Sequence, residues 1–322
     1  MARAARGGFE HIRKARRRVT PRIPTRRLRL FAVVIASVVS VAGLCTGGAH
    51  AWHDRTEVTY YVSVGDSYAA GYRPDGKSGL ETGDGYAYQL TDILNRSGRW
   101  ELRNFGCVGQ TAHGMQLDNG CTAGALASGG VDYPETTQLR AADTFMAEHQ
   151  GEVGLVTVAM GANDMVRCLD LADDGAVQHC AEQMSTEVRQ SLGVFLTATR
   201  ALLGNDVPIV GISYFNVFHA AGPAGPLEAS RRSTLSQTLF DNYLNPTLRD
   251  IYSQAGAYFV DSSTIAGNDL PESRMSPLPG HGTVSTSTAR LCGLTYYCSD
   301  HDPHPNRAGH ALIAQAIAEA IT

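Results

Sequence analysis

Hydrophobic residues along most of the chain form short runs that alternate with amphipathic stretches. Runs rich in apolar and β-branched side chains are typical of buried strands, and they lie at residues 59–64, 102–105, 154–160, 209–213 and 257–260. Stretches with apolar side chains at helical spacing lie at residues 86–96, 182–203 and 308–321. Parallel neighbouring strands need a crossover that a helix supplies, so the alternation predicts a parallel sheet covered by helices on both faces.

The whole chain after residue 58 is consistent with one α/β domain of three layers, α/β/α. No internal repeat and no linker rich in Pro, Ser or Gly divides it. The segment 262–298 differs in texture, because it is dense in Ser, Thr, Gly and Pro and shows little periodicity. We predict a long loop there, tied down by Cys292 and Cys298.

The N-terminus has the order of an export signal. Residues 13–29 are crowded with positive charge, residues 30–45 are an apolar stretch of 16, and Ala49-His50-Ala51 follows shortly after. The apolar stretch is shorter than the roughly 20 residues that cross a bilayer comfortably. We therefore expect a signal peptide at 1–51, cleaved after Ala51, and a mature chain of 52–322 that is secreted. An uncleaved anchor and the export route stay open.

Cysteine usage fits an oxidising compartment. Without Cys45, which falls in the signal, an even set of six remains: Cys107, Cys121, Cys168, Cys180, Cys292 and Cys298. In an exported chain such a set predicts three disulfides. The three close pairs are separated by long spans without cysteine, which favours the sequential pairing 107/121, 168/180 and 292/298.

Composition and charge exclude several classes of protein. The chain has 322 residues, 43% hydrophobic and 18% charged, so it can bury a large core and is not disordered as a whole. Residues 52–322 carry 16 basic and 30 acidic side chains, net −14. A nucleic-acid binder should present a basic face to phosphates, so we expect no nucleic-acid partner.

The first predicted strand runs directly into Gly65-Asp66-Ser67. Functional groups gather at the carboxyl ends of strands in an open parallel sheet, so Ser67 stands where a nucleophile would. Alone, the tripeptide is also ordinary turn and capping chemistry.

Three further segments follow predicted strands or precede the last predicted helix, at residues 104–111, 161–164 and 302–306. With the first block, this ordered set resembles the SGNH hydrolases, also called the GDSL lipase/esterase family, and looks closest to secreted actinobacterial members. The resemblance covers residues 58–322 and maps the four named family residues onto Ser67, Gly109, Asn163 and His304. It implies a flavodoxin-like five-stranded sheet of order 2-1-3-4-5.

Acyl transfer explains why these residue types belong together. A serine hydroxyl is a weak nucleophile at neutral pH and needs a base, for which we expect His304. Negative charge on the tetrahedral intermediate needs donors, and resemblance and chemistry agree on the backbone N–H groups of Ser67 and Gly109 and the side-chain amide of Asn163. Removing one such donor costs about 3 kcal/mol of transition-state stabilisation.

The acid that orients the histidine departs from the family pattern. The usual arrangement is Asp-x-x-His, but His301 occupies the acid position here. We rank Asp302 first as the orienting group, Asp300 second, and a main-chain carbonyl serving a Ser/His dyad third.

For three other polar residues near these blocks we expect roles that do not involve catalysis. Asp66 and Asp164 flank catalytic candidates and are expected to hold turns by bonding to backbone. For His310, in the last predicted helix, exposure or packing is the expectation. We expect no metal and no cofactor, since the serine chemistry needs neither.

The substrate is expected to be a small-molecule or lipid ester, with lipase or carboxylesterase activity. Two segments are candidates for the acyl side: residues 215–226, with Phe215, Val217 and Phe218, and the disulfide-tied segment with Leu291, Leu294, Tyr296 and Tyr297. These apolar residues could equally be buried under their loops. The alternatives are a phospholipase, an acyltransferase, or a catalytically silent lipid- or carbohydrate-binding protein. We expect a monomer without a membrane span after signal removal.

Overall fold

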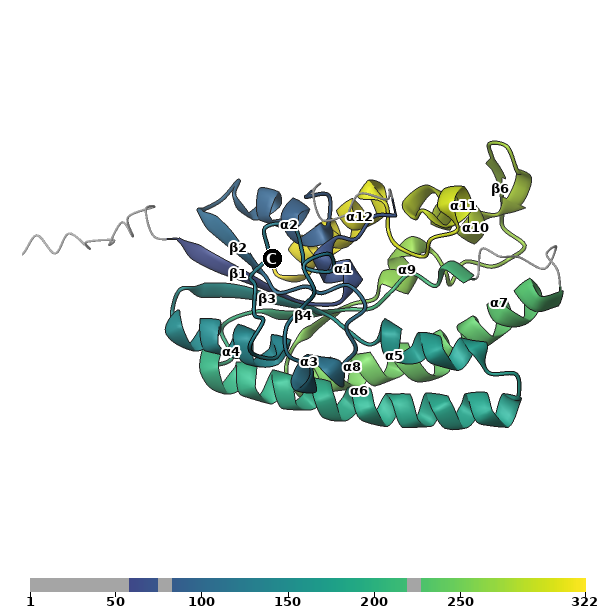
Figure 1. Cartoon of the computed structure of the whole chain (residues 1–322). Coiled ribbons are helices and arrows are strands. Elements are labelled where there is room, and N and C mark those ends of the chain that lie inside the picture. The colour runs from purple at the N-terminus through teal and green to yellow at the C-terminus, as the bar shows by residue number, and fades with distance from the viewer. Residues whose placement is uncertain (1–57, 75–82, 219–226) are drawn as a thin grey trace, which may run out of the picture. The chain divides into compact units, whose positions relative to one another are not determined.

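A parallel sheet of five strands forms the centre of the structure (Figure 1). This computed structural model describes residues 58–74, 83–218 and 227–322. The strands are β1 (Thr59–Gly65), β2 (Trp100–Asn104), β3 (Val153–Ala159), β4 (Ile209–Ile212) and β5 (Tyr258–Val260). Their order is β2-β1-β3-β4-β5 and every neighbouring pair is parallel, which confirms the predicted fold class and strand order.

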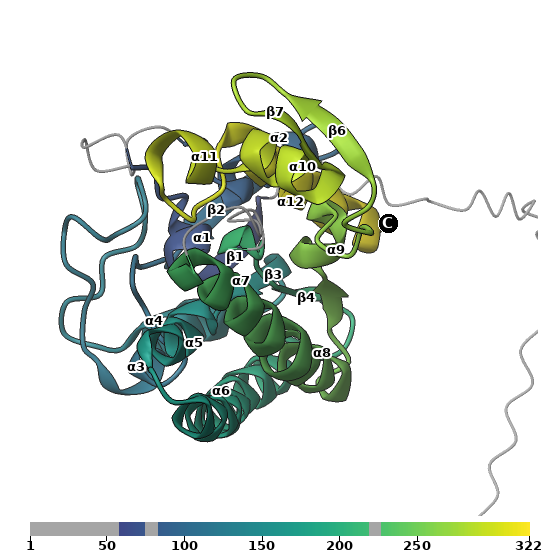
Figure 2. The same cartoon turned by 90° about the vertical axis from the view of Figure 1, so that its right-hand side faces the viewer.

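Helices cover both faces of the sheet. On one face lie α2 (Tyr86–Leu94) and α12 (Arg307–Ala320), and on the other lie α4 (Gln138–Glu148), α6 (Asp174–Leu203) and α8 (Asn245–Gln254) (Figure 2). Contacts between α2 and α12, and from α6 to both α4 and α8, hold each layer together. The two central strands, β1 and β3, are therefore almost completely buried.

Shorter elements sit mainly where strands and helices join. They are α1 (Ser67–Ala70), α3 (Gly114–Leu117), α5 (Ala162–Val166), a 3-10 turn (Arg167–Asp170), α7 (Leu227–Leu239), a π-helical turn (Phe240–Leu244), α9 (Ser262–Ala266), α10 (Thr286–Leu294) and α11 (Tyr297–Asp300). Two further strands, β6 (Met275–Leu278) and β7 (Gly282–Ser285), pair with each other as an antiparallel hairpin.

The segment 262–298 is not the long loop that its composition suggests. It folds into α9, the β6–β7 hairpin, α10 and the start of α11. Some of the polar residues at this point are helix caps: the side chain of Asp261, just before the segment, accepts the Thr264 N–H, and that of Ser285 accepts the Thr288 N–H. The elements are also too short to display a repeating pattern.

The six cysteines pair in sequence order, as predicted, in the bridges Cys107–Cys121, Cys168–Cys180 and Cys292–Cys298. Residues 1–51, the predicted signal, lie outside the described residues. Among the helices that the structure does describe, none combines the length and apolarity needed to cross a bilayer.

Candidate active site

Ser67 is held at the carboxyl end of β1 by a tight strand-to-helix turn. Gly65 has φ of 149°, and a Cβ there would lie 2.2 Å from the Ala159 carbonyl oxygen of β3, so only glycine fits. Asp66 then caps α1, because its carboxylate accepts the Tyr68 N–H at 2.9 Å. This confirms the turn-holding role expected for Asp66 and makes Ser67 the first residue of α1.

His304 lies against Ser67 although 237 positions separate them. The distance from His304 Nε2 to Ser67 Oγ is 2.8 Å. On the other side of the ring, His304 Nδ1 lies 2.8 Å from Asp302 Oδ1. A carboxylate only accepts hydrogen bonds, so Nδ1 carries the proton and Nε2 is free to accept from the serine hydroxyl.

Of the three candidates for orienting the imidazole, the structure places Asp302 at the ring. Partial burial acts to raise the pKa of Asp302, but hydrogen bonding and the charge of His304 outweigh it and hold the pKa below its ordinary value. Asp302 is therefore ionised at neutral pH. Asp300 is exposed and accepts a bond from the Ser299 hydroxyl instead. His301, at the family's acid position, is exposed with φ of 56°.

The second and third blocks meet through one hydrogen bond. Asn163, in the first turn of α5 after β3, donates from Nδ2 to the Gln110 carbonyl oxygen at 2.9 Å. Gly109 directly precedes Gln110 and has φ of 82°. A Cβ added at Gly109 would meet no atom within 4 Å. The backbone conformation, and not crowding by neighbours, accounts for glycine at this position.

The loop that carries Gly109 is fixed at several points. Cys107 joins it to Cys121, and the Ala112 N–H donates to Asp164 Oδ2 at 2.9 Å. The backbone contact expected for Asp164 is therefore confirmed. The carboxylate is almost fully buried, which raises its pKa.

A cavity of about 190 Å³ opens beside Ser67, Asn163 and His304; we call it the catalytic cavity. Its remaining wall is largely apolar and includes Val166, Phe215, Val217, Phe218 and Phe240. Three of these belong to the predicted segment 215–226, whose residues 219–226 lie outside the described part of the chain.

The disulfide-tied segment does not contribute to this wall. Of its four candidate residues, Leu291 is fully buried, and Leu294 and Tyr297 pack against the core. Tyr296 does not line the catalytic cavity either. Leu291, Leu294 and Tyr297 therefore pack under their own segment, which is the alternative given for them in the sequence analysis.

Sequence reasoning missed a contact between the cavity wall and the nucleophile turn. The Tyr214 hydroxyl donates to Asp66 Oδ2 at 2.6 Å, and Tyr214 itself lines the catalytic cavity. Burial raises the pKa of Asp66 to about 7, although the bonds from Tyr214 and Tyr68 oppose the rise. One sequence feature could have indicated this contact: Tyr214 directly follows a predicted strand, which places it at the same sheet edge as Ser67.

His310 takes the packing role. It is 1% exposed, between the rings of Tyr68 and Tyr86, and burial lowers its pKa to about 3. The imidazole is therefore neutral at physiological pH. Within the described residues, no three or more His, Cys, Asp or Glu side chains are grouped so that they could hold a metal ion.

The fold and the residues gathered at the carboxyl edge of the sheet define a class of hydrolase. A family model described as GDSL-like lipase/acylhydrolase matches residues 63–312. The chain belongs to this family and is a serine ester hydrolase.

Solved structures with a similar fold include an extracellular lipase from Streptomyces rimosus, with 16% identity and a TM-score of 0.49 over 81% of this chain and 99% of that one. Another is the acetylxylan esterase Axe2 from Geobacillus stearothermophilus, with 17% identity and a TM-score of 0.47 over 82% of this chain and 94% of that one. No curated protein matches the sequence significantly.

Proposed function

We propose that the protein hydrolyses carboxylic esters through an acyl-enzyme on Ser67, with His304 as general base and Asp302 as the group that orients it. The observation that carries this proposal is the continuous hydrogen-bonded series Asp302–His304–Ser67 beside the catalytic cavity. The Ser67 oxygen attacks the ester carbonyl while its proton passes to His304 Nε2. His304 then returns the proton to the departing alcohol, and water repeats the sequence to release the acid.

Three donors stabilise the oxyanion in this proposal: the backbone N–H groups of Ser67 and Gly109 and the side-chain amide of Asn163. Ser67 lies in the first turn of α1, where N–H groups have no helical acceptor. Asn163 Nδ2 carries two hydrogens and uses one of them on the Gln110 carbonyl, so the second is available. The same bond fixes the orientation of the amide before substrate arrives.

The substrates we propose are esters with a short or medium apolar acyl group. Support comes from the wall formed by Phe215, Val217, Phe218 and Phe240, which offers an acyl chain dispersion contacts and no polar group to desolvate. The cavity volume of about 190 Å³ is below the ~300–1,000 Å³ of drug-sized ligand sites, which favours small acyl groups over long ones.

We also propose that the enzyme acts outside the cell. Three disulfides persist in an oxidising environment and not in a reducing cytosol. The basic and apolar order of residues 1–45 is that of an export signal.

Ser67→Ala tests the mechanism. The variant should lower kcat for p-nitrophenyl butyrate by at least ~10³-fold, because the nucleophile is lost while the donors remain. Ser191→Ala is the matched control, since Ser191 is also a buried serine but lies on α6. Both variants should keep the wild-type Tm within a few degrees. Wild-type turnover by Ser67→Ala would refute the proposed nucleophile.

A further inference from the structure

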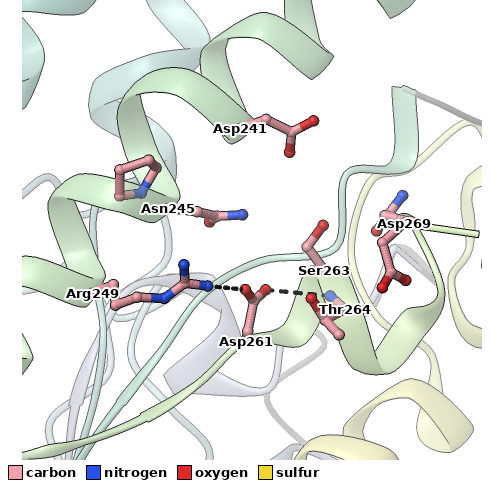
Figure 3. A pocket seen from close by; sticks show the side chains of 9 residues that line it. Asp241, Asn245, Arg249, Asp261, Ser263, Thr264 and Asp269 are labelled. Carbon is pink, nitrogen blue, oxygen red and sulfur yellow. Dashed lines mark hydrogen bonds and ion pairs between the residues drawn. The ribbon is translucent and has the colours of Figure 1, made fainter.

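A second cavity, of about 200 Å³, lies between the π-helical turn, α8 and α9 (Figure 3). We call it the polar cavity, because its lining side chains include Asp241, Asn245, Arg249, Asp261, Ser263 and Asp269. Neither the proposed catalytic step nor the motifs that identify the family use any of these residues.

Two buried side chains point into the polar cavity with unused hydrogen-bonding capacity. Asn245 and Ser263 are each 6% exposed, and within the described residues neither side chain has a protein hydrogen-bond partner. The Asn245 side-chain oxygen, Oδ1, is buried without any partner there. Figure 3 shows the Asn245 amide nitrogen and the Ser263 hydroxyl directed toward the same space from opposite sides. Polar groups that are nine-tenths buried normally have partners, so this pair indicates a site for a ligand that supplies them.

The neighbouring ion pair, in contrast, is already satisfied. Asp261 Oδ2 accepts from Arg249 at 2.8 Å, and Asp261 Oδ1 accepts the Thr264 N–H at 3.2 Å as the cap of α9. These bonds fix one side of the polar cavity in place. A ligand would therefore meet a preformed wall.

The mixture of donors and acceptors selects the chemical class of the ligand. Carboxylates accept, Arg249 donates, the Asn245 amide can do either, and the Ser263 hydroxyl does both. An alcohol also donates and accepts through one oxygen, so adjacent hydroxyl groups match such a wall. An ammonium ion only donates and would oppose the guanidinium. Among the described residues, no aromatic ring lines the cavity, which removes the usual support for a quaternary ammonium.

We propose that the polar cavity binds a polyhydroxylated group, such as one sugar ring or a short polyol. Its volume suits a single ring and not an oligosaccharide chain. The carboxylates of Asp241 and Asp269 accept from the hydroxyl groups, and Asn245 and Ser263 complete their own hydrogen bonding with the ligand.

The polar cavity shares a wall with the catalytic cavity. Phe240 lines the catalytic cavity while the next residue of the π-helical turn, Asp241, lines the polar one. Asn216 lies between two residues of the apolar wall and exchanges two bonds with Asn268 of the polar cavity, at 3.2 and 3.0 Å. The proposed ligand therefore binds behind the wall of the catalytic cavity and not against Ser67.

Isothermal titration of the mature protein with D-glucose, D-xylose and glycerol tests the proposal. We expect saturable, millimolar binding of at least one of the three by the wild type. Ser263→Ala and Asn245→Leu should each weaken it roughly tenfold, because each removes one hydrogen bond of the site. Ser287→Ala is the matched control, as a fully buried serine on α10, and should bind like the wild type.

The outcome does not depend on the proposed function, because the same titration on Ser67→Ala should give the wild-type affinity. Ser263→Ala should also hydrolyse p-nitrophenyl acetate within about twofold of the wild-type rate, which shows that it folds. The proposal is overturned if the wild type binds none of the three polyols, if Ser263→Ala and Asn245→Leu bind as tightly as the wild type, or if methylammonium binds in preference to them.

Discussion

Asp302 reaches the histidine from an unusual sequence position because of a local turn. His301 has a left-handed backbone conformation, with φ of 56°, and ends α11. Asp302 Oδ1 then accepts both the backbone N–H of His304, at 2.9 Å, and the ring Nδ1–H, at 2.8 Å. A carboxylate that bonds the N–H two residues later is an ordinary Asx turn. The turn thus replaces the family's three-residue spacing with a spacing of two.

We predict that Asp302→Asn lowers kcat by ~10³–10⁴-fold. The amide can donate to Nδ1, which would move the ring proton to Nε2 and leave no acceptor for the Ser67 hydroxyl. Asp300→Asn is the control, because Asp300 bonds Ser299 and not the ring, and it should change kcat by less than about threefold. Steady-state kinetics on a p-nitrophenyl ester measures both. Small, equal effects would instead favour a main-chain carbonyl as the orienting group.

Asp66 gives the protein a predictable pH dependence of stability. Burial raises its pKa from 3.8 to about 7, so the folded chain keeps a proton on Asp66 that the unfolded chain has lost. The contribution of this group to the free energy of unfolding is therefore present below about pH 4 and is lost as pH rises through about 7.

Asp66→Asn should remove the loss of stability that the titration of Asp66 causes as pH rises, since an amide does not titrate. Relative to the wild type, the variant should gain stability between about pH 4 and pH 8, by up to about 4 kcal/mol. Urea unfolding of both proteins across this range measures the difference. A difference that stays constant with pH would show that Asp66 has an ordinary pKa in the folded chain.

At the scale of elements, the sequence could predict those whose burial follows a regular pattern. All five strands were predicted to within two residues at each end. For β1, β3 and β4 the reason is that their apolar runs match strands buried on both faces. α6 begins at Asp174, eight residues earlier than its predicted start, since only Val177 and Ala181 continue the buried stripe there. α4 was missed, because it buries the polar Gln138, which donates to the carbonyls of Gly65 and Phe105.

Only those residues of the site that lie in short sequence motifs could be predicted from the sequence. Ser67 and His304 each lie in a short block at a strand end or before a helix, so their order along the chain places them at one sheet edge. The contact of Tyr214 with Asp66 spans 148 positions and follows no local pattern. Phe240 enters the catalytic cavity from a π-helical turn, a rare conformation that hydrophobic periodicity does not indicate.

At the scale of the whole molecule, the N-terminal 51 residues and the rest of the chain carry net charges of opposite sign. Residues 1–51 carry eleven basic side chains and one acidic one, net +10, whereas residues 52–322 carry net −14. A basic segment followed by an apolar one is the pattern of an export signal, so we predict that residues 1–51 direct export. If residues 1–51 are removed on export, as we predict, the negative charge of residues 52–322 opposes association between copies of the chain.

We predict that the exported enzyme begins at Trp52. Small residues at positions 49 and 51 match the requirement of the signal-cleaving enzyme, so Ala51→Phe should block cleavage and keep the chain with the membrane fraction. Ala42→Phe is the control, because it places the same side chain within the apolar stretch and not at the cleavage site. Intact mass and N-terminal sequencing of protein from the culture medium check both. Full-length wild-type chain in the membrane fraction would instead establish residues 30–45 as an uncleaved anchor, with the catalytic cavity then held at the cell surface.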